Sequence, residues 1–115
     1  MKPLNRETIN TILDLADGDT NVLIELLISF LKDAEELSEE INHAVTNLDW
    51  NQLQFKVHTL KGLSGTMGAK PLFEICKMLN DDLKKGNTQS ATSLAISLSV
   101  EYNDLEEYIK SNYKI

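Results

Sequence analysis

Apolar residues recur at intervals of three and four along nearly all of the 115-residue chain, and this periodicity limits the fold more than any other feature. Such spacing gathers apolar side chains on one face of an α-helix. The sequence contains no sustained alternation of polar and apolar residues, the pattern of a half-buried strand. Proline, which interrupts helices, occurs only at positions 3 and 71. The sequence therefore predicts an all-α protein.

Capping signals divide the first half of the chain into three predicted helices. Asn5 suits the N-cap of a short first helix, which the turn Asp17-Gly18-Asp19 would end. A second helix of roughly 27 residues, about 40 Å long, follows. Asp49 with Gln52 resembles a capping box, so a third helix is predicted to start at Trp50. We expect these helices to bury Ile9, Ile12 and Leu13, then Leu23, Leu27, Phe30, Ala34, Leu37, Ile41, Ala44 and Leu48, then Leu53, Val57, Leu60, Ser64 and Met67.

The second half of the chain predicts two further helices. Pro71 suits the first turn of the fourth helix, which Lys84-Lys85-Gly86 would close, and the fifth begins near Thr88. Their expected core residues are Leu72, Ile75, Cys76, Leu79 and Leu83, then Ala91, Leu94, Leu98, Leu105 and Ile109. Short connections favour antiparallel neighbours. We therefore predict that residues 1–115 form one domain, an antiparallel up-down four-helix bundle with an additional short N-terminal helix.

Composition narrows the choice of partners. The net charge of −7 disfavours binding to nucleic acid phosphates, so a protein partner is expected. No apolar run approaches the roughly 20 residues that a membrane span needs, so no membrane insertion is expected. The lone cysteine, Cys76, excludes an intrachain disulfide and suits the reducing cytoplasm. Because the chain starts with Met and carries no tail, we expect a free-standing protein. We also expect a monomer, located in the cytoplasm.

Charge is distributed unevenly along the chain. Residues 31–50 contain six acidic residues and one lysine, whereas residues 50–73 contain three lysines and no acidic residue. A site that handles an anion is therefore expected in the second stretch.

A histidine lies in that basic stretch, on the predicted third helix. The apolar stripe of this helix leaves Gln54, His58, Lys61, Gly62 and Gly65 on another face. His58 should therefore be at least partly exposed, with a ring nitrogen lone pair available as a nucleophile at pH 7. The outer ring nitrogen, Nε2, is the less hindered one. Lys61 lies one turn further along and could steady the oxygens of a phosphoryl group on that ring.

The two glycines beside this histidine need an explanation. A glycine inside a helix costs about 1 kcal/mol relative to alanine, so Gly62 and Gly65 together cost roughly 2 kcal/mol. The absence of side chains at these positions would let the backbone and loops of another protein approach the helix closely. Close packing between helices would also explain them. Gly68 is less informative, because a glycine there would simply end the helix.

The whole segment from Val57 to Ala69 resembles the signature of histidine-phosphotransfer (HPt) domains, which reads roughly His-x-Leu-Lys-Gly-x-Ser/Ala-x-x-x-Gly-Ala. Leu72 and Cys76 continue the pattern, and Phe30 and Leu48-Asp49 upstream also look like the family. The resemblance covers essentially the whole chain. Val57 departs from it, because the family often has alanine there.

This resemblance implies a function for each matching residue. His58 would be the phosphorylated nucleophile, Lys61 would stabilise the phosphoryl group, and Gly62 would leave room for it. The phosphoryl donor and acceptor would be aspartates of receiver domains in response regulators or hybrid sensor kinases. The receiver would contribute Mg²⁺, since no cofactor and no metal site are predicted for this chain. A partner surface would centre on Gln54, Lys61, Gly62 and Gly65, with Ile9 and Ile24 suggested at its edge.

Other interpretations fit the sequence less well. The chain has no Walker-type phosphate loop and no kinase motifs, so we expect a phosphoryl carrier without kinase activity of its own. A non-catalytic helical adaptor is the main alternative, although such a protein has no need of Lys61. A metal enzyme using His43, His58 and Cys76 is disfavoured, because these residues have no recognised ligand spacing. His43, preceded by Glu39 and Glu40, is interpreted as solvated surface.

Overall fold

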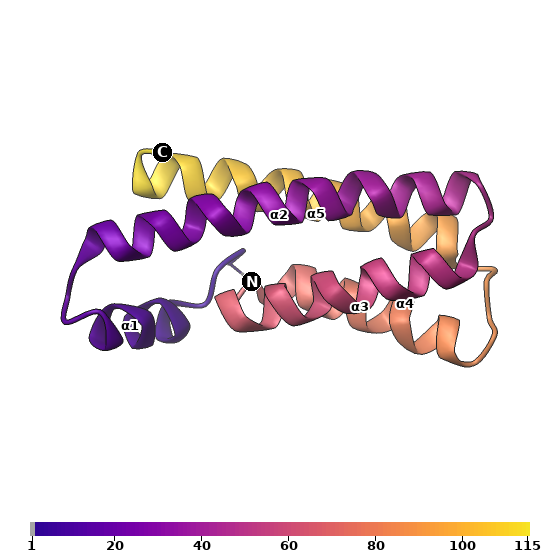
Figure 1. The fold of residues 1–115 in the computed structure, drawn as a ribbon, viewed down its shortest axis with the longest axis horizontal. Helices are drawn as coiled ribbons and strands as arrows, with labels where there is room; N and C mark the ends of the chain where they lie inside the picture. The colour runs from indigo at the N-terminus through magenta and orange to yellow at the C-terminus, as the bar shows by residue number, and fades with distance from the viewer. Residues whose placement is uncertain (1) are drawn as a thin grey trace.

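The computed structural model describes residues 2–115, and these residues form five α-helices and no strand. The helices are α1 (Arg6–Leu15), α2 (Thr20–Thr46), α3 (Trp50–Met67), α4 (Lys70–Lys84) and α5 (Ala91–Tyr113). Figure 1 shows α2 to α5 running along the long axis of a molecule that measures 44 × 22 × 22 Å. The predicted four-helix bundle with a short N-terminal helix is confirmed.

The four long helices form a closed ring of neighbours. Helix α2 packs against α3 and α5, and α4 packs against the same two helices from the opposite corner. The connections are short, so consecutive helices are antiparallel, as Figure 1 shows. Helix α1 contacts α2 and α3 at one end of the bundle. One face of the molecule is therefore made by α1, α3 and α4.

Side-chain caps begin the first three helices, and those of α1 and α3 are the ones that the sequence predicts. The Asn5 side chain accepts hydrogen bonds from the backbone N–H groups of Glu7 and Thr8, at 2.8 and 3.3 Å. Asp19 caps α2 in the same way, and Asp49 accepts from the N–H of Gln52 at 3.2 Å. Each bond satisfies a donor that the first turn of a helix leaves unpaired.

Gly68 joins α1 to the end of α3. It has a left-handed φ of 74°, which ends α3, and its carbonyl accepts a hydrogen bond from the N–H of Asn5 at 2.8 Å. A Cβ at this position would lie 2.6 Å from Cβ of Thr8. Gly68 therefore ends the helix, as predicted, and also allows the close approach of the N-terminal segment.

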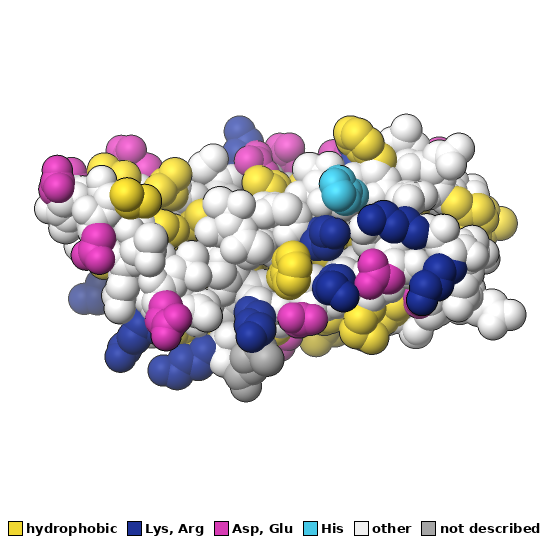
Figure 2. All heavy atoms as spheres, turned by 90° about the horizontal axis from the view of Figure 1, so that it is seen from below, with side chains coloured by type: hydrophobic (Ala, Val, Ile, Leu, Met, Phe, Trp, Pro, Cys, Tyr) yellow, Lys and Arg dark blue, Asp and Glu magenta, His cyan; other side chains and the backbone are white. Residues whose placement is uncertain are grey.

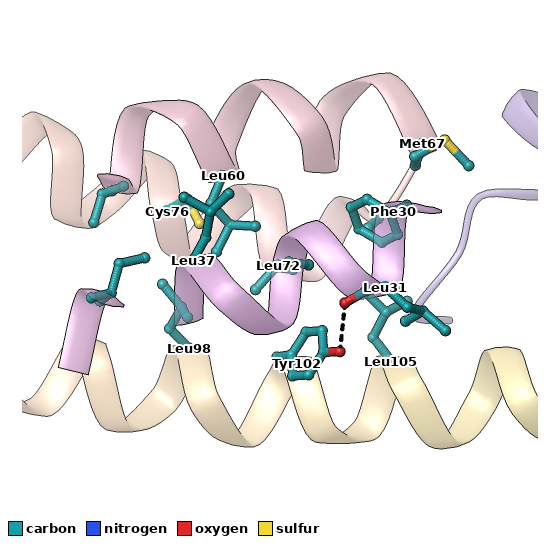
Figure 3. Close-up of a cluster of buried hydrophobic side chains, with 14 of the residues drawn as sticks. Phe30, Leu31, Leu37, Leu60, Met67, Leu72, Cys76, Leu98, Tyr102 and Leu105 are labelled. Carbon is teal, nitrogen blue, oxygen red and sulfur yellow. Dashed lines mark hydrogen bonds between the residues drawn. The ribbon is translucent and has the colours of Figure 1, made fainter. Parts of the chain in front are cut away.

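The core fills the space inside the ring of helices. Figure 3 shows side chains from α2, α3, α4 and α5 meeting there. The hydroxyl of Tyr102 is within this core, 3.0 Å from the Leu31 carbonyl oxygen and 3.1 Å from a carboxylate oxygen of Glu106. Burial, together with the Glu106 charge, raises the pKa of Tyr102. Tyr102 was not among the core residues predicted from the sequence.

Several details differ from the sequence-based expectation. Leu48 is not part of the α2 stripe: it is 66% exposed and has a left-handed φ of 55°. It lies in the tight turn between α2 and α3, which directs its side chain outward.

The fifth helix begins at Ala91 instead of near Thr88. The Ser64 hydroxyl is buried, but it has no hydrogen-bond partner among residues 2–115. Four expected core residues are only partly buried: Ile12, Leu13, Ile75 and Leu94.

Candidate functional site

His58 projects from the outer side of α3. Its neighbours on the buried stripe, Val57 and Leu60, are fully enclosed, whereas His58 is exposed. Figure 2 shows the face made by α1, α3 and α4, where basic side chains lie along one side of a histidine side chain. The predicted exposure of His58 is therefore confirmed, and its ring is accessible to a second protein.

The groove between α3 and α4 has a regular register. Because the two helices are antiparallel, residues of α3 and α4 face each other in pairs, as Gly65 and Phe73 do. Towards the start of α3, both helices line an open hollow of about 290 Å³. Its lining residues are Asn51, Gln54, Phe55 and His58 from α3, and Asn80 and Lys84 from α4. His58 therefore shares a hollow with Gln54, as the helix-face argument predicts.

Lys61 lies one turn beyond His58 and is partly buried. Burial raises the pKa of the Cys76 thiol on α4 to about 12, and the positive charge of Lys61 opposes this effect. Lys61 is therefore close to α4, one helical turn from His58 along the same groove between α3 and α4. Cys76 itself is enclosed in the core and is protonated at pH 7, which makes it a poor nucleophile and a poor metal ligand.

The lysines of the basic stretch have different surroundings. Lys56 forms an ion pair with Glu40 of α2, with Nζ 2.5 Å from the carboxylate oxygen. On α4, Lys77 pairs with Asp81 at 3.3 Å. Within residues 2–115, neither Lys61 nor Lys84 has a carboxylate oxygen within 4.0 Å of its Nζ. Lys61, one turn from His58 on α3, and Lys84, across the hollow, are therefore without a close carboxylate in this part of the chain.

The glycines of α3 differ in what a side chain would meet. A Cβ added at Gly62 would have no atom within 4 Å, so nothing inside the protein requires glycine there. At Gly65 a Cβ would lie 3.4 Å from the ring of Phe73. Gly65 also lines another hollow, with Ser64 and Thr8, away from His58. Only Gly62 combines an open surface with a position one turn from the histidine.

Other predicted site residues lie elsewhere. Ile9 is buried, but it lines a hollow at the α1 end of the bundle together with Ile24, so its place at the edge of a partner surface stays a prediction. Ile24 is partly buried and lines the same hollow with Tyr108 and Tyr113. Within residues 2–115, no group of three or more His, Cys, Asp and Glu side chains could hold a metal ion. In the same part of the chain, no helix is long and apolar enough to span a membrane.

Four residues of the hollow beside His58 were not predicted from the sequence: Asn51, Phe55, Asn80 and Lys84. Phe55 is 64% exposed, Lys84 lies on the neighbouring helix, and Asn80 is fully buried. The period of α4 did contain a signal for Asn80, because it follows Leu72 and Cys76 at steps of four. A polar residue was not counted as part of an apolar stripe. Lys84 could not be paired with His58 without knowing how α3 and α4 pack.

The exposed imidazole of His58, beside two lysines without ion pairs and an open glycine, places this helical bundle in a class of module. Such a module offers a side chain to a partner protein instead of enclosing a small substrate. Residues 25–110 match the family model of the Hpt domain. The chain belongs to this family.

Solved structures confirm the fold. Histidine-containing phosphotransfer protein B (HptB) from Pseudomonas aeruginosa PAO1 superposes with a TM-score of 0.89 at 24% identity, covering 97% of this chain and 95% of that one. The HPT domain of a sensor hybrid histidine kinase from Shewanella gives a TM-score of 0.77 at 23% identity, covering 95% and 92%.

A curated relative matches at the level of sequence. The chain is 24% identical over 102 residues to histidine-containing phosphotransfer protein 2 of Arabidopsis thaliana. The match covers 86% of this chain but 65% of that protein, so the chain spans a little under two thirds of the relative's length.

Proposed function

We propose that this chain is a phosphorelay intermediate that accepts a phosphoryl group on His58 from a receiver-domain aspartate and passes it to another receiver aspartate. The observation that carries the proposal is the exposed imidazole of His58 on α3, with Lys61 and Gly62 in the next turn. Membership of the Hpt domain family supports the same role.

The transfer reaction requires few chemical groups from the chain itself. A lone pair of the His58 ring attacks the phosphorus atom of the aspartyl phosphate, forming an N–P bond while the O–P bond to the carboxylate breaks. The carboxylate leaves as an anion, and the ring proton is released to solvent. Transfer to the next receiver reverses these steps. Positioning and charge stabilisation supply most of the catalysis of such transfers.

The residues around His58 would divide these tasks. Lys61, which has no carboxylate partner within 4.0 Å among residues 2–115, would neutralise charge on the phosphoryl oxygens. Gly62 would let the backbone of the receiver approach α3, because it leaves open space on the surface. Gln54 and Gly65 would contact the partner above and below the histidine. The receiver would bring the Mg²⁺ ion, and this chain would hold no metal of its own.

We further propose that the chain acts as a monomer in the cytoplasm and has no kinase activity. A transient contact with each receiver suits a carrier, because the same surface must bind the donor and then the acceptor in turn. The buried, unpaired Cys76 is consistent with a reducing compartment.

The proposal is tested by incubating the protein with a receiver domain phosphorylated on aspartate, in the presence of Mg²⁺. We expect an acid-labile, base-stable phosphoryl group on the wild-type chain and none on the His58→Gln variant. Incubation with ATP and Mg²⁺ alone should give no label. Failure to label with several receivers, under conditions where an established carrier works, would favour a helical adaptor without a phosphorelay role.

A further inference from the structure

A hollow of about 300 Å³ lies at the α1 end of the bundle, between the N-terminal segment, α1, the start of α2 and the end of α5. Figure 1 shows these parts of the chain at the same end of the molecule. Helix α1 packs against α2 and α3 but has no packing contact with α5 within residues 2–115. The hollow therefore occupies the gap between α1 and α5, and it shares no lining residue with the hollow of His58.

The floor of this hollow is apolar. Leu4, Ile9 and Leu23 line it and are buried, with exposed fractions of 4%, 6% and 2%. Leu13 and Ile24 also line it and are partly buried. Binding sites for small molecules are mostly apolar and carry a few polar groups that orient the ligand. Because a water molecule takes up about 30 Å³, the hollow has room for roughly ten non-hydrogen atoms.

The charged residues that line the hollow are both cations, Lys2 and Arg6. This lining contrasts with the whole chain, which has 18 acidic and 11 basic residues. Within residues 2–115, neither cation has a carboxylate oxygen within 4.0 Å. The charge of the hollow is therefore complementary to an anion.

Two tyrosines of α5, Tyr108 and Tyr113, line the side of the hollow opposite α1. Burial raises the pKa of Tyr113, Tyr108 adds to the rise, and the positive charge of Arg6 opposes it. Arg6 therefore lies within electrostatic reach of the Tyr113 hydroxyl. A guanidinium and a phenol both donate hydrogen bonds, and a carboxylate accepts them from both.

We infer that this hollow is a binding site for a small amphipathic carboxylate, a ligand with one carboxylate group and an apolar chain. The carboxylate would lie between Arg6 and Tyr113, and the apolar chain would lie against Leu4, Ile9 and Leu23. The bound ligand would bridge α1 to α5, which have no packing contact of their own in the described part of the chain. The inference goes beyond the proposed function and does not depend on His58.

The test titrates the nitrogen-15-labelled protein with octanoate, which matches the size of the hollow, and follows the backbone amide signals. We expect saturable shifts confined to the residues around the hollow, with a dissociation constant on the order of 1 mM for a ligand of this size. Octan-1-ol should bind about fivefold more weakly, because it has no charge to pair with Arg6. Butyrate should bind at least about tenfold more weakly, because it buries less apolar surface.

Three variants locate the ligand. Arg6→Gln should weaken octanoate about fivefold and leave octan-1-ol within about twofold of the wild type, because only the charge is removed. Lys70→Gln is the matched control, since Lys70 is an exposed cation that does not line this hollow. It should bind both ligands within about twofold of the wild type. Ile24→Phe fills part of the hollow and should weaken both ligands.

Three outcomes would overturn the inference. The first is an absence of saturable shifts in the wild type at octanoate concentrations up to about 20 mM. The second is an equal loss in Arg6→Gln and Lys70→Gln, which would mean that octanoate responds only to the general positive charge of this end of the molecule. The third is a shift of the same amides with protein concentration alone, which would assign the hollow to contact with a second copy of the chain. None of these measurements involves phosphoryl transfer, so failure of the proposed function would leave their result unchanged.

Discussion

The two histidines of the chain, His43 and His58, resemble each other in almost every local respect. Each lies on a long helix, each is exposed, and each lines an open hollow. Their surroundings differ. The hollow of His43 is lined by Glu39, Asn42 and Thr46, all from its own helix, and its Nδ1 lies 3.3 Å from the Asn47 side-chain nitrogen.

The surroundings of His58 come from two helices. Lys84 and Asn80 of α4 share its hollow, and Gly62 leaves open space one turn away. Exposure alone therefore does not distinguish a reactive histidine from a solvated one. The charge and size of the neighbours do, because a phosphoryl group needs positive charge and an incoming receiver needs room.

The largest expected effect is the loss of the nucleophile. We expect His58→Gln to abolish phosphoryl transfer and His43→Gln to leave the rate within about twofold of the wild type, because glutamine has no ring nitrogen to attack phosphorus. Both variants should keep their helical circular dichroism, since both positions are exposed. The measurement is transfer of labelled phosphate from a receiver. Label on His58→Gln but not on His43→Gln would show that His43, and not His58, accepts the phosphoryl group.

The next largest effect concerns the room beside His58. We expect Gly62→Phe to fold normally, because a Cβ there meets nothing within 4 Å, and to slow transfer at least about a hundredfold by keeping the receiver away. Gly62→Ala is the matched control. It should raise the free energy of unfolding by about 1 kcal/mol and reduce transfer only slightly. Normal transfer by Gly62→Phe would show that the receiver does not approach this turn.

A smaller effect is expected from the charge at position 61. Lys61→Ala should slow transfer about tenfold without abolishing it, because the nucleophile is retained while one charge-assisted contact is lost. Lys56→Ala is the control, since Lys56 is already paired with Glu40. We expect its transfer rate within about twofold of the wild type. Stopped-flow or quenched transfer assays at fixed ionic strength would measure both, and equal losses would mean that only the general positive charge of α3 matters.

The smallest expected effect comes from copying the motif to the other histidine. Thr46→Lys combined with Asn47→Gly, in a His58→Gln background, gives His43 a lysine at plus three and a glycine at plus four. We expect no detectable label on this protein. Its hollow still contains Glu39 and has no contribution from α4. Appreciable labelling at His43 would mean that the local sequence motif is sufficient and that the groove between α3 and α4 is dispensable.

The sequence itself determined most of the architecture. Helical periodicity, the caps at Asn5 and Asp49, and the left-handed Gly68 follow from interactions within a few residues, and such interactions are encoded locally. The same locality explains why His58, Lys61 and Gly62 could be placed on one helix face. Leu48 was misplaced because its environment depends on how the turn between α2 and α3 closes.

The packing of α3 against α4 determined the surroundings of His58, which no local sequence pattern predicts. It set Asn80 and Lys84 beside His58, although they follow it by more than 20 residues in the sequence. It also left Lys61 without a carboxylate partner, while α2 supplied one to Lys56. Contacts between helices depend on register and on which side chains fill the shared core. The sequence thus determined the helices and the reactive residue, and the tertiary structure determined its surroundings.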